Sequence, residues 1–309
     1  MRARTIAHLG SEDEGPELFG KVRDARVDQE GRLVVLDEQT SEVRFFSPDG
    51  TYLHGFGKFG DGPLEMRHTR GLELLGPNRL AVYYTLGKAK VFARTAGQWQ
   101  LESIVTLPVT VEDNCTFPDR IFLHGIILRP RGDPTLFYEM RQLGDTAPAR
   151  YGSGYQDDLW LVRDILSFGE IACVPALGQV IFAFQLLPLV RSYSAETGDV
   201  LWSAYVEDYI QRRLVEVPEQ GLRNYHGLPH DLLATALTMP SGHVVLQYRR
   251  HADELRLEMV RTYLLDPESG HGSLISDELP EIESFYEGGY VALFEDPYPR
   301  IELRAFQTG

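Results

Sequence analysis

The stretch VRDARVDQEGRLVVLDEQTSEVRFFSPDGTYLHGFG, residues 22–57, reads as four short β-strands joined by tight turns. Its segments RLVVLD and EVRFF are rich in the β-branched and aromatic residues typical of strands. The segment SPDG supplies the proline and glycine that a tight reversal needs. Four short strands in succession form one meander, so this stretch predicts a repeat of an all-β fold.

The same plan recurs along the chain. In the first repeat Gly31 opens the second strand, and Val43 lies within the third strand 12 positions later. A similar step occurs at Gly125–Phe137, Gly178–Val190 and Gly289–Ile301, and with altered loops in residues 76–92 and 242–260. Six repeats of about 45 residues, with no long amphipathic helix between them, predict a six-bladed β-propeller that spans residues 1–309 as a single domain.

The N-terminus begins with the end of a repeat. The segment HLGSEDEGPELF, residues 8–19, matches GFGKFGDGPLEM, residues 55–66, at a constant offset of 47 residues. The last repeat, in contrast, stops at IELRAFQTG after three predicted strands. We therefore expect the N-terminal strand to join the last blade and close the ring, because an open seam would expose the edges of two strands.

The first repeat resembles the NHL-type repeat of six-bladed β-propellers. Its glycine-to-aspartate strand is Gly31 to Asp37, and a hydrophobic pair, Phe45 and Phe46, precedes the Pro-Asp-Gly turn and a Gly-Gly-Pro connector. The chain is most similar to bacterial six-bladed propeller proteins of unassigned activity. The fold's relatives include peptide binders, calcium-dependent lactonases, strictosidine-synthase-like enzymes and zinc-dependent lyases, so the resemblance leaves open whether this chain is an enzyme.

The amino-acid composition limits the classes of partner that the protein could bind. A formal net charge of -15 argues against nucleic acid or an anionic membrane as a partner, and no apolar run is long enough to span a membrane. The start MRARTIAHLGSEDEG lacks the apolar segment of a secretory signal. We expect a cytoplasmic monomer, with an extracytoplasmic location left open if a signal segment has been removed.

The two cysteines, Cys115 and Cys173, are predicted to lie on the innermost strands of neighbouring repeats. They are too few for a disulfide-based scaffold, and we expect them to serve as small buried apolar residues. Whether they pair is left open at this point.

Two connectors, at about residues 144–168 and 207–231, are longer than the others. Long connectors in a compact domain are often functional, so we expect these two to cap the mouth of the axial channel, or alternatively to pack against its rim. Their aromatic residues Tyr155, Trp160 and Tyr225 are the predicted apolar contacts of a ligand.

Several basic residues precede or open strands on the presumed mouth. They are Arg67, His68, Arg70, Arg120 and Arg223. Guanidinium groups hold carboxylates in bidentate pairs, so this set predicts a site for an anionic small molecule or an extended peptide. The alternative is that the set forms salt bridges with nearby acidic residues, namely Glu65, Glu112, Asp113 and Asp119.

A second hypothesis is a metal-dependent hydrolase or lyase of the lactonase or strictosidine-synthase-like type. Its predicted ligands for calcium or zinc are Asn114, Asn224, His226, His230 and Asp231. The last four belong to or flank the loop NYHGLPHD, whose glycine and proline argue against a helix but allow the side chains to converge.

Overall fold

The computed structural model describes the chain with short gaps, as residues 2–125, 135–217, 221–224, 228–253 and 256–307. Within these ranges the regular secondary structure is almost entirely β-strand. Its helical segments are the short helix α1 (Trp160–Leu166) and the 3-10 turn η1 (Pro175–Leu177). None of the described helices is long and apolar enough to cross a membrane.

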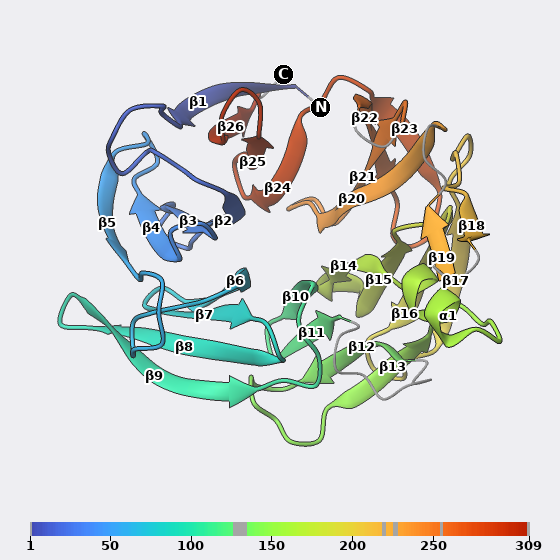
Figure 1. Cartoon of the computed structure of the whole chain (residues 1–309), viewed down its shortest axis with the longest axis horizontal. Coiled ribbons are helices and arrows are strands. Elements are labelled where there is room, and N and C mark those ends of the chain that lie inside the picture. The colour runs from blue at the N-terminus through green and yellow to red at the C-terminus, as the bar shows by residue number, and fades with distance from the viewer. Residues whose placement is uncertain (1, 126–134, 218–220, 225–227, 254–255, 308–309) are drawn as a thin grey trace. The chain divides into compact units, whose positions relative to one another are not determined.

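The chain divides into two compact units. Unit 1 comprises residues 1–112 and 280–309, and unit 2 comprises residues 113–279. Each unit contains three four-stranded antiparallel sheets within its described residues. Six successive sheets of four strands, labelled in Figure 1, make the fold an all-β, six-bladed β-propeller, which confirms the prediction from the repeats.

The sheets of unit 1 hold the first, second and last blades. The first sheet contains β2 (Val22–Val27), β3 (Leu33–Asp37), β4 (Glu42–Phe46) and β5 (Tyr52–Phe56). The second contains β6 (Thr69–Gly76), β7 (Arg79–Tyr84), β8 (Lys88–Thr95) and β9 (Gln98–Thr106). The last contains β24 (Glu281–Tyr286), β25 (Gly289–Phe294), β26 (Arg300–Phe306) and β1 (Ala3–Leu9).

The sheets of unit 2 hold the third, fourth and fifth blades. The third sheet contains β10 (Asp113–Phe117), β11 (Arg120–His124), β12 (Thr135–Met140) and β13 (Ala149–Ser153). The fourth contains β14 (Gly169–Val174), β15 (Gln179–Phe184), β16 (Leu189–Ser194) and β17 (Val200–Tyr205). The fifth contains β20 (His230–Thr238), β21 (Val244–His251), β22 (Leu257–Leu265) and β23 (Gly272–Ser276).

The N-terminal strand completes the last blade, as the displaced repeat predicted. Strand β1 pairs antiparallel with β26, with Ala7 opposite Leu303 and Leu9 opposite Ile301 (Figure 1). Leu9 is fully buried, and its side chain lies beside the turn glycine Gly50 of the first blade. The seam between the last and the first blade is therefore closed by non-covalent contacts.

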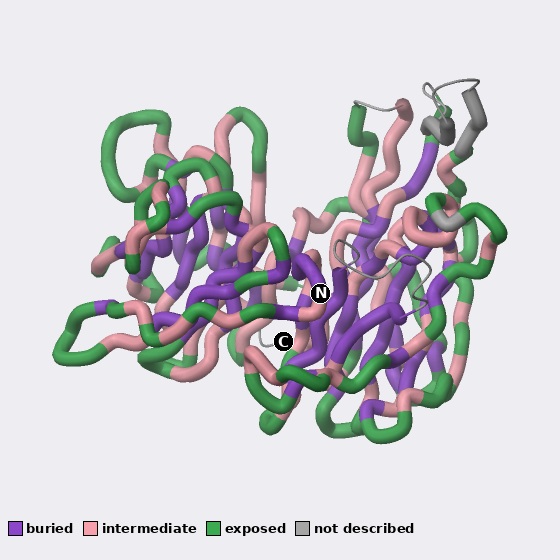
Figure 2. The backbone as a smooth tube through the Cα atoms, turned by 60° about the horizontal axis from the view of Figure 1, so that its bottom comes forward, coloured by how far each residue is buried: buried purple, intermediate pink, exposed green. Residues whose placement is uncertain are grey.

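The second strands of the sheets are the most deeply buried, because other blades cover both of their faces. All five residues of β3 are buried, whereas burial alternates in the outer strand β9. Figure 2 shows the same division, with burial along the strands and exposure at the turns. Trp99 on β9 stacks on Phe45 and Phe56 of the first blade, so it packs between blades as its outer-strand position indicated.

The predicted connectors differ in part from expectation. Residues 144–168 include β13, the outer strand of the third blade, before helix α1 begins at Trp160. Residues 207–231 include the two-stranded sheet of β18 (Leu214–Val217) and β19 (Gly221–Asn224). The segment EDYIQRRLVEV, residues 207–217, contains no helix, and its last residues pair with β19 as β18.

The cysteines also differ from expectation. Cys115 on β10 and Cys173 on β14 form a disulfide, with their Cα atoms 5.5 Å apart. The prediction placed them correctly on innermost strands of neighbouring blades but treated them as small apolar residues. Strands β10 and β14 lie side by side, which brings the two thiols together across 58 residues of sequence.

Candidate functional site

Three neighbouring first strands of unit 1 carry an unusual number of charged side chains. Strand β2 lies beside both β24 and β6, and in a propeller the first strand of each blade is innermost. The charges on these strands form what we name the inner-strand charge cluster. Its members are Arg23, Asp24, Arg26, Arg70, Glu73 and Glu283.

The centre of the cluster is Arg26, which pairs with two carboxylates. Its Nε donates to Asp24 Oδ1 at 3.0 Å, and its Nη1 donates to Glu73 Oε2 at 2.8 Å. Burial alone would lower the pKa of Arg26, but Asp24 and Glu73 outweigh it and raise that pKa. The main-chain N–H of Leu72 also donates to Asp24 at 2.9 Å. These bonds fix β2 against β6, so the cluster is held rigidly.

Glu283 on β24 lies next to this network, and its carboxyl group differs in protonation from the paired carboxylates Asp24 and Glu73. Burial, followed by the negative charge of Asp24, raises the pKa of Glu283 to about 8, although Arg26 and Arg23 act in the opposite direction. Its carboxyl group therefore carries a proton at neutral pH, when it offers an O–H donor rather than a second negative charge.

The arginines at the end of the cluster occupy equivalent positions of the repeat. Arg23 and Arg70 are 47 residues apart, and Arg23 Nε donates to the carbonyl oxygen of Arg70 at 2.9 Å. Among the residues that the structure describes, no carboxylate lies within ion-pair distance of Arg23. Arg70 Nη1 is 3.7 Å from Glu112 Oε2, and the Arg70 side chain is 32% exposed. The guanidinium groups of Arg23 and Arg70, on neighbouring strands, thus retain unused donors.

The other predicted anion contacts in unit 1 lie in the connector before β6. Arg67 Nη2 is 2.6 Å from Asp61 Oδ2, and its guanidinium lies over the ring of Phe59. His68 is exposed, with a positive φ of 50°. Arg67 is therefore paired, although with Asp61 rather than with the neighbouring Glu65.

The remaining predicted arginines belong to unit 2. Arg120 on β11 lies within 4 Å of three carboxylates, with the shortest distance of 3.2 Å to Asp119. Arg223 lies on β19, where the structure describes the backbone but not the side chain. The pairs Arg70–Glu112 and Arg120–Asp119 are those that the salt-bridge alternative expected.

The aromatic candidates are only partly described. The main-chain N–H of Tyr155 donates to Ser167 Oγ at 2.9 Å, and its side chain is 37% exposed. Trp160 is the first residue of α1, but its side chain lies outside the described part of the structure, as does Tyr225 entirely. Contact of these residues with a ligand stays a prediction.

The candidate metal ligands do not converge within the described residues. Asp231 on β20 accepts two hydrogen bonds of 2.8 Å from Arg250 and one of 2.8 Å from the main chain of Ile210. His230 beside it stacks on His251, with ring centroids 5.1 Å apart. Both oxygens of Asp231 therefore serve a salt bridge that anchors the connector to the fifth blade.

The other candidate metal ligands lie elsewhere. Asn114 is a buried residue of β10, Asn224 ends β19 with its side chain undescribed, and His226 lies outside the described residues. In the described ranges, no three side chains among His, Cys, Asp and Glu are grouped as metal ligands would be. Calcium or zinc binding stays a prediction with no described cluster to support it.

The sequence analysis named Arg70 but missed the rest of the cluster. The signal was present in VRDARV, where three of six residues on a predicted inner strand are charged. Strands buried by neighbours on both faces are usually apolar throughout, so charges in such a strand indicate a face that borders the channel or a polar network.

Comparison with solved structures supports the fold. A protein from Bacteroides fragilis named "Putative exported protein" is 12% identical, with a TM-score of 0.62 over 99% of this chain and 95% of that one. A member of the DUF4221 family from Bacteroides vulgatus is 8% identical, with a TM-score of 0.61 over 100% and 99%. The Cps50 (Swd1) β-propeller domain of Myceliophteria thermophila is 12% identical, with a TM-score of 0.52 over 94% and 98%.

These identities are low, so the similarities establish the fold and not an activity. No protein-family model matches the chain. No curated protein matches it either. The chain has a six-bladed β-propeller fold whose solved neighbours include proteins named without an assigned activity.

Proposed function

We propose that the protein is a binding propeller that takes an anionic group, carried by a small molecule or an extended peptide, at Arg23 and Arg70. The observation that carries this proposal is the unused hydrogen-bonding capacity of the guanidinium groups of Arg23 and Arg70, whose strands lie side by side. Arg23 has no ion pair in the described chain, and Arg70 is held only by a 3.7 Å contact to Glu112. Guanidinium donors suit a carboxylate or a phosphate.

The rest of the cluster favours such a ligand at neutral pH. Arg26 is neutralised by Asp24 and Glu73, and the raised pKa of Glu283 keeps its carboxyl group uncharged. The anion would therefore meet Arg23, which has no ion pair in the described chain, and Arg70, with its 3.7 Å contact to Glu112, without an opposing carboxylate on Glu283. When the pH rises through about 8, Glu283 gains a negative charge, and we expect the affinity for an anion to fall.

Residues of the two long connectors and their neighbours would extend this binding surface. We propose Arg67, His68, Arg120, Arg223, Tyr155, Trp160 and Tyr225 as such contacts, since each was expected on the channel mouth. The metal-dependent hydrolase or lyase remains the alternative, and no specific contact among the described residues favours it.

Calorimetric titration of the full chain with inorganic phosphate and with succinate tests the proposal. Removing a charge-assisted hydrogen bond costs about 1.5–3 kcal/mol, so Arg70→Gln and Arg23→Gln should each weaken binding by at least about tenfold. The matched control is Arg79→Gln, because Arg79 lies in the same sheet as Arg70 but forms a bidentate pair with Glu102. Absence of binding by either anion, or an equal loss in the control, would refute the proposal.

We also propose that the first repeat is of the NHL type. In support, the motif aspartate Asp37 is fully buried and accepts hydrogen bonds from the main-chain N–H groups of Gly20 and Lys21 in the connector. The aspartate thus ties the repeat to the connector before it, as a residue at a fixed motif position would.

The disulfide favours an oxidising compartment as the site of action. Disulfides persist in secreted and periplasmic proteins and are rare in the cytosol, and one structural neighbour is named as an exported protein. We therefore propose an extracytoplasmic location. To test this, cells are lysed under denaturing conditions in the presence of an alkylating agent, and the protein is analysed by mass spectrometry. Cys115 and Cys173 should be unmodified, whereas quantitative alkylation of both would contradict the proposal.

A further inference from the structure

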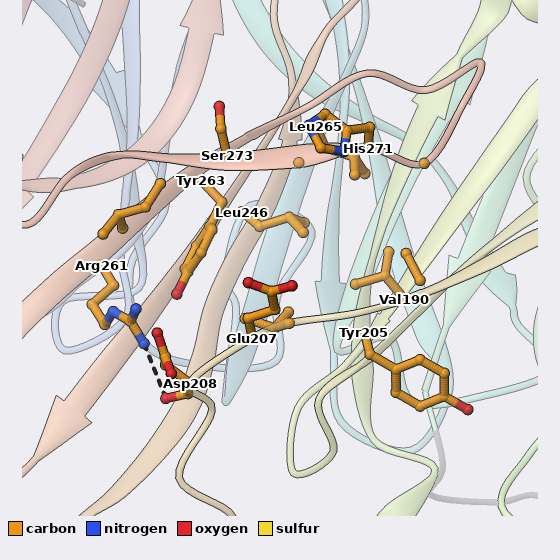
Figure 3. Close-up of a pocket in the computed structure, with 15 residues that line it drawn as sticks. Val190, Tyr205, Glu207, Asp208, Leu246, Arg261, Tyr263, Leu265, His271 and Ser273 are labelled. Atoms are coloured by element: carbon orange, nitrogen blue, oxygen red, sulfur yellow. Dashed lines mark hydrogen bonds between the residues drawn. The ribbon is translucent and has the colours of Figure 1, made fainter.

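The fourth and fifth blades of unit 2 enclose a pocket between their outer parts. Its volume is about 370 Å³, and it is lined by residues of β16, β17, β21, β22 and β23 and by the turn that follows β17 (Figure 3). This volume is in the range of small-molecule sites, roughly 300–1,000 Å³. The pocket lies away from the inner-strand charge cluster in sequence and belongs to the other unit.

The pocket arises from a change of side-chain size along β17. Trp202 fills the space beside the fifth blade, where its indole N–H donates to the carbonyl oxygen of Pro267 at 2.8 Å. Its ring lies against Gly270, where a Cβ atom would come within 2.8 Å of it. Ala204, two residues along the strand, points to the same side as Trp202 but fills little of the space.

The floor of the pocket is part of the hydrophobic core. Val190, Leu246 and Leu265 line it, and their exposed fractions are 2%, 2% and 3%. A ligand with an apolar group about the size of one ring would cover this floor. Burial of that apolar surface would supply the hydrophobic part of its binding energy. Tyr205 is 73% exposed, and Figure 3 shows its ring directed away from Glu207 and Val190, so it is not part of this floor.

The polar groups of the pocket are arranged around a carboxylate. Figure 3 shows the side chain of Glu207 rising into the space between Tyr263 and Val190. No hydrogen bond or ion pair engages this carboxylate within the described chain. The phenolic oxygen of Tyr263 is buried and likewise lacks a hydrogen-bond partner among the described residues. Glu207 therefore offers the pocket a carboxylate with no donor from the described chain, whereas the Tyr263 oxygen lies beneath the pocket surface.

The cationic side chain of the pocket is already engaged. Arg261 is 8% exposed, donates to the carbonyl oxygen of Asp208 at 3.2 Å, and lies 5.3 Å from the ring centroid of Tyr263. The Asp208 side chain lies beside it in Figure 3, on the same wall. Arg261 thus belongs to the wall, whereas Glu207 projects from it, and this arrangement favours a positively charged ligand.

We propose that this pocket binds a small organic cation, a protonated amine attached to an apolar ring-sized body. The ammonium group donates to Glu207, and the ring of Tyr263 adds cation–π attraction. The net charge of -15 raises the local concentration of such cations around the protein.

Calorimetric titration of the full chain with three phenylethyl probes of different charge tests this proposal. The probes are 2-phenylethylamine, its neutral analogue 2-phenylethanol, and the anion 3-phenylpropionate. Because a charge-assisted hydrogen bond is worth about 1.5–3 kcal/mol, the amine should bind at least about tenfold more tightly than the alcohol. The anion should not compete with it. Equal affinity for all three probes, or no binding of the amine at millimolar concentration, would overturn the proposal.

Two variants locate the site. Glu207→Gln removes an exposed charge and should weaken the amine about tenfold, whereas Glu268→Gln, an exposed change in the turn between β22 and β23, should not. Ala204→Leu fills the pocket and should abolish amine binding. If Glu207→Gln binds the amine as the unmodified protein does, the assignment fails, whether or not the Ala204 variant folds.

Discussion

Substitution of one residue in the N-terminal strand tests how the last blade is completed. Leu9 on β1 is fully buried at the junction between the last and first blades, next to Ile301 and Gly50. Ile6 on the same strand is 40% exposed. Leu9→Ala therefore removes buried methyl groups and leaves a cavity, whereas Ile6→Ala removes methyl groups that already meet solvent.

The expected sizes follow from these burials. Buried Leu→Ala changes cost about 2–5 kcal/mol of unfolding free energy, and exposed substitutions cost about 0.5 kcal/mol. Guanidinium denaturation followed by tryptophan fluorescence measures both variants against the unmodified protein, with the slope of the transition as a check that the unfolding reaction is unchanged. Equal small losses in Leu9→Ala and Ile6→Ala would show that β1 does not stabilise the blade, and the reasoning on the seam would fail.

Three further outcomes are expected from particular contacts. Glu283 stays protonated in the folded protein up to about pH 8 but ionises near 4.5 when unfolded, so its contribution to stability falls as the pH rises between these values. Glu283→Gln should remove this pH dependence and raise the free energy of unfolding at pH 8 by about 2 kcal/mol, as measured by urea denaturation. The pKa shift sets an upper limit of about 5 kcal/mol, and the partial exposure of the side chain reduces it. A pH profile of stability unchanged by the substitution would contradict this prediction. Loss of the Cys115–Cys173 disulfide through paired serine substitutions should cost about 4 kcal/mol for a loop of 58 residues, and a melting temperature independent of reductant would exclude a stabilising bond. Gly270→Ala should lower stability by about 1–3 kcal/mol and shift the fluorescence of Trp202, because φ is +72° and the new Cβ would meet the indole; an unperturbed emission spectrum would show that the indole lies elsewhere.

The fold could be predicted from the sequence because its signals are local. Each blade is a meander whose turns lie a few residues apart, so Gly31, the SPDG turn and the 47-residue offset are visible without knowledge of distant contacts. Where distant contacts decide, prediction was weaker. The pairing of Cys115 with Cys173 depends on two adjacent first strands separated by a whole blade, and β18 forms only because β19 lies opposite it.

The candidate site was harder to predict because charge pairing depends on side-chain geometry. The sequence shows Arg67 beside Glu65, but the structure pairs it with Asp61 across the turn. Similarly, Asp231 sits beside two histidines in the sequence, although its carboxylate is held by Arg250 on the next strand. Neighbours in sequence point to opposite faces of a strand, so adjacency there says little about contact.

The repeat that indicates the fold also contains information on the site. Equivalent positions of the first two blades lie 47 residues apart, and this offset relates Arg23 to Arg70 and Arg26 to Glu73. Arg23 and Arg70 carry the same positive charge at equivalent positions, whereas Arg26 and Glu73 carry opposite charges. A reversed charge at an equivalent position allows the two blades to form the ion pair of 2.8 Å that fixes β2 to β6. A repeated positive charge cannot pair with itself, so Arg23 donates to a main-chain carbonyl of β6 and Arg70 lies 3.7 Å from Glu112. Comparing the blades of one chain position by position therefore separates charges that pair with their equivalents on the next blade from charges that do not, and Arg23 and Arg70 belong to the second class.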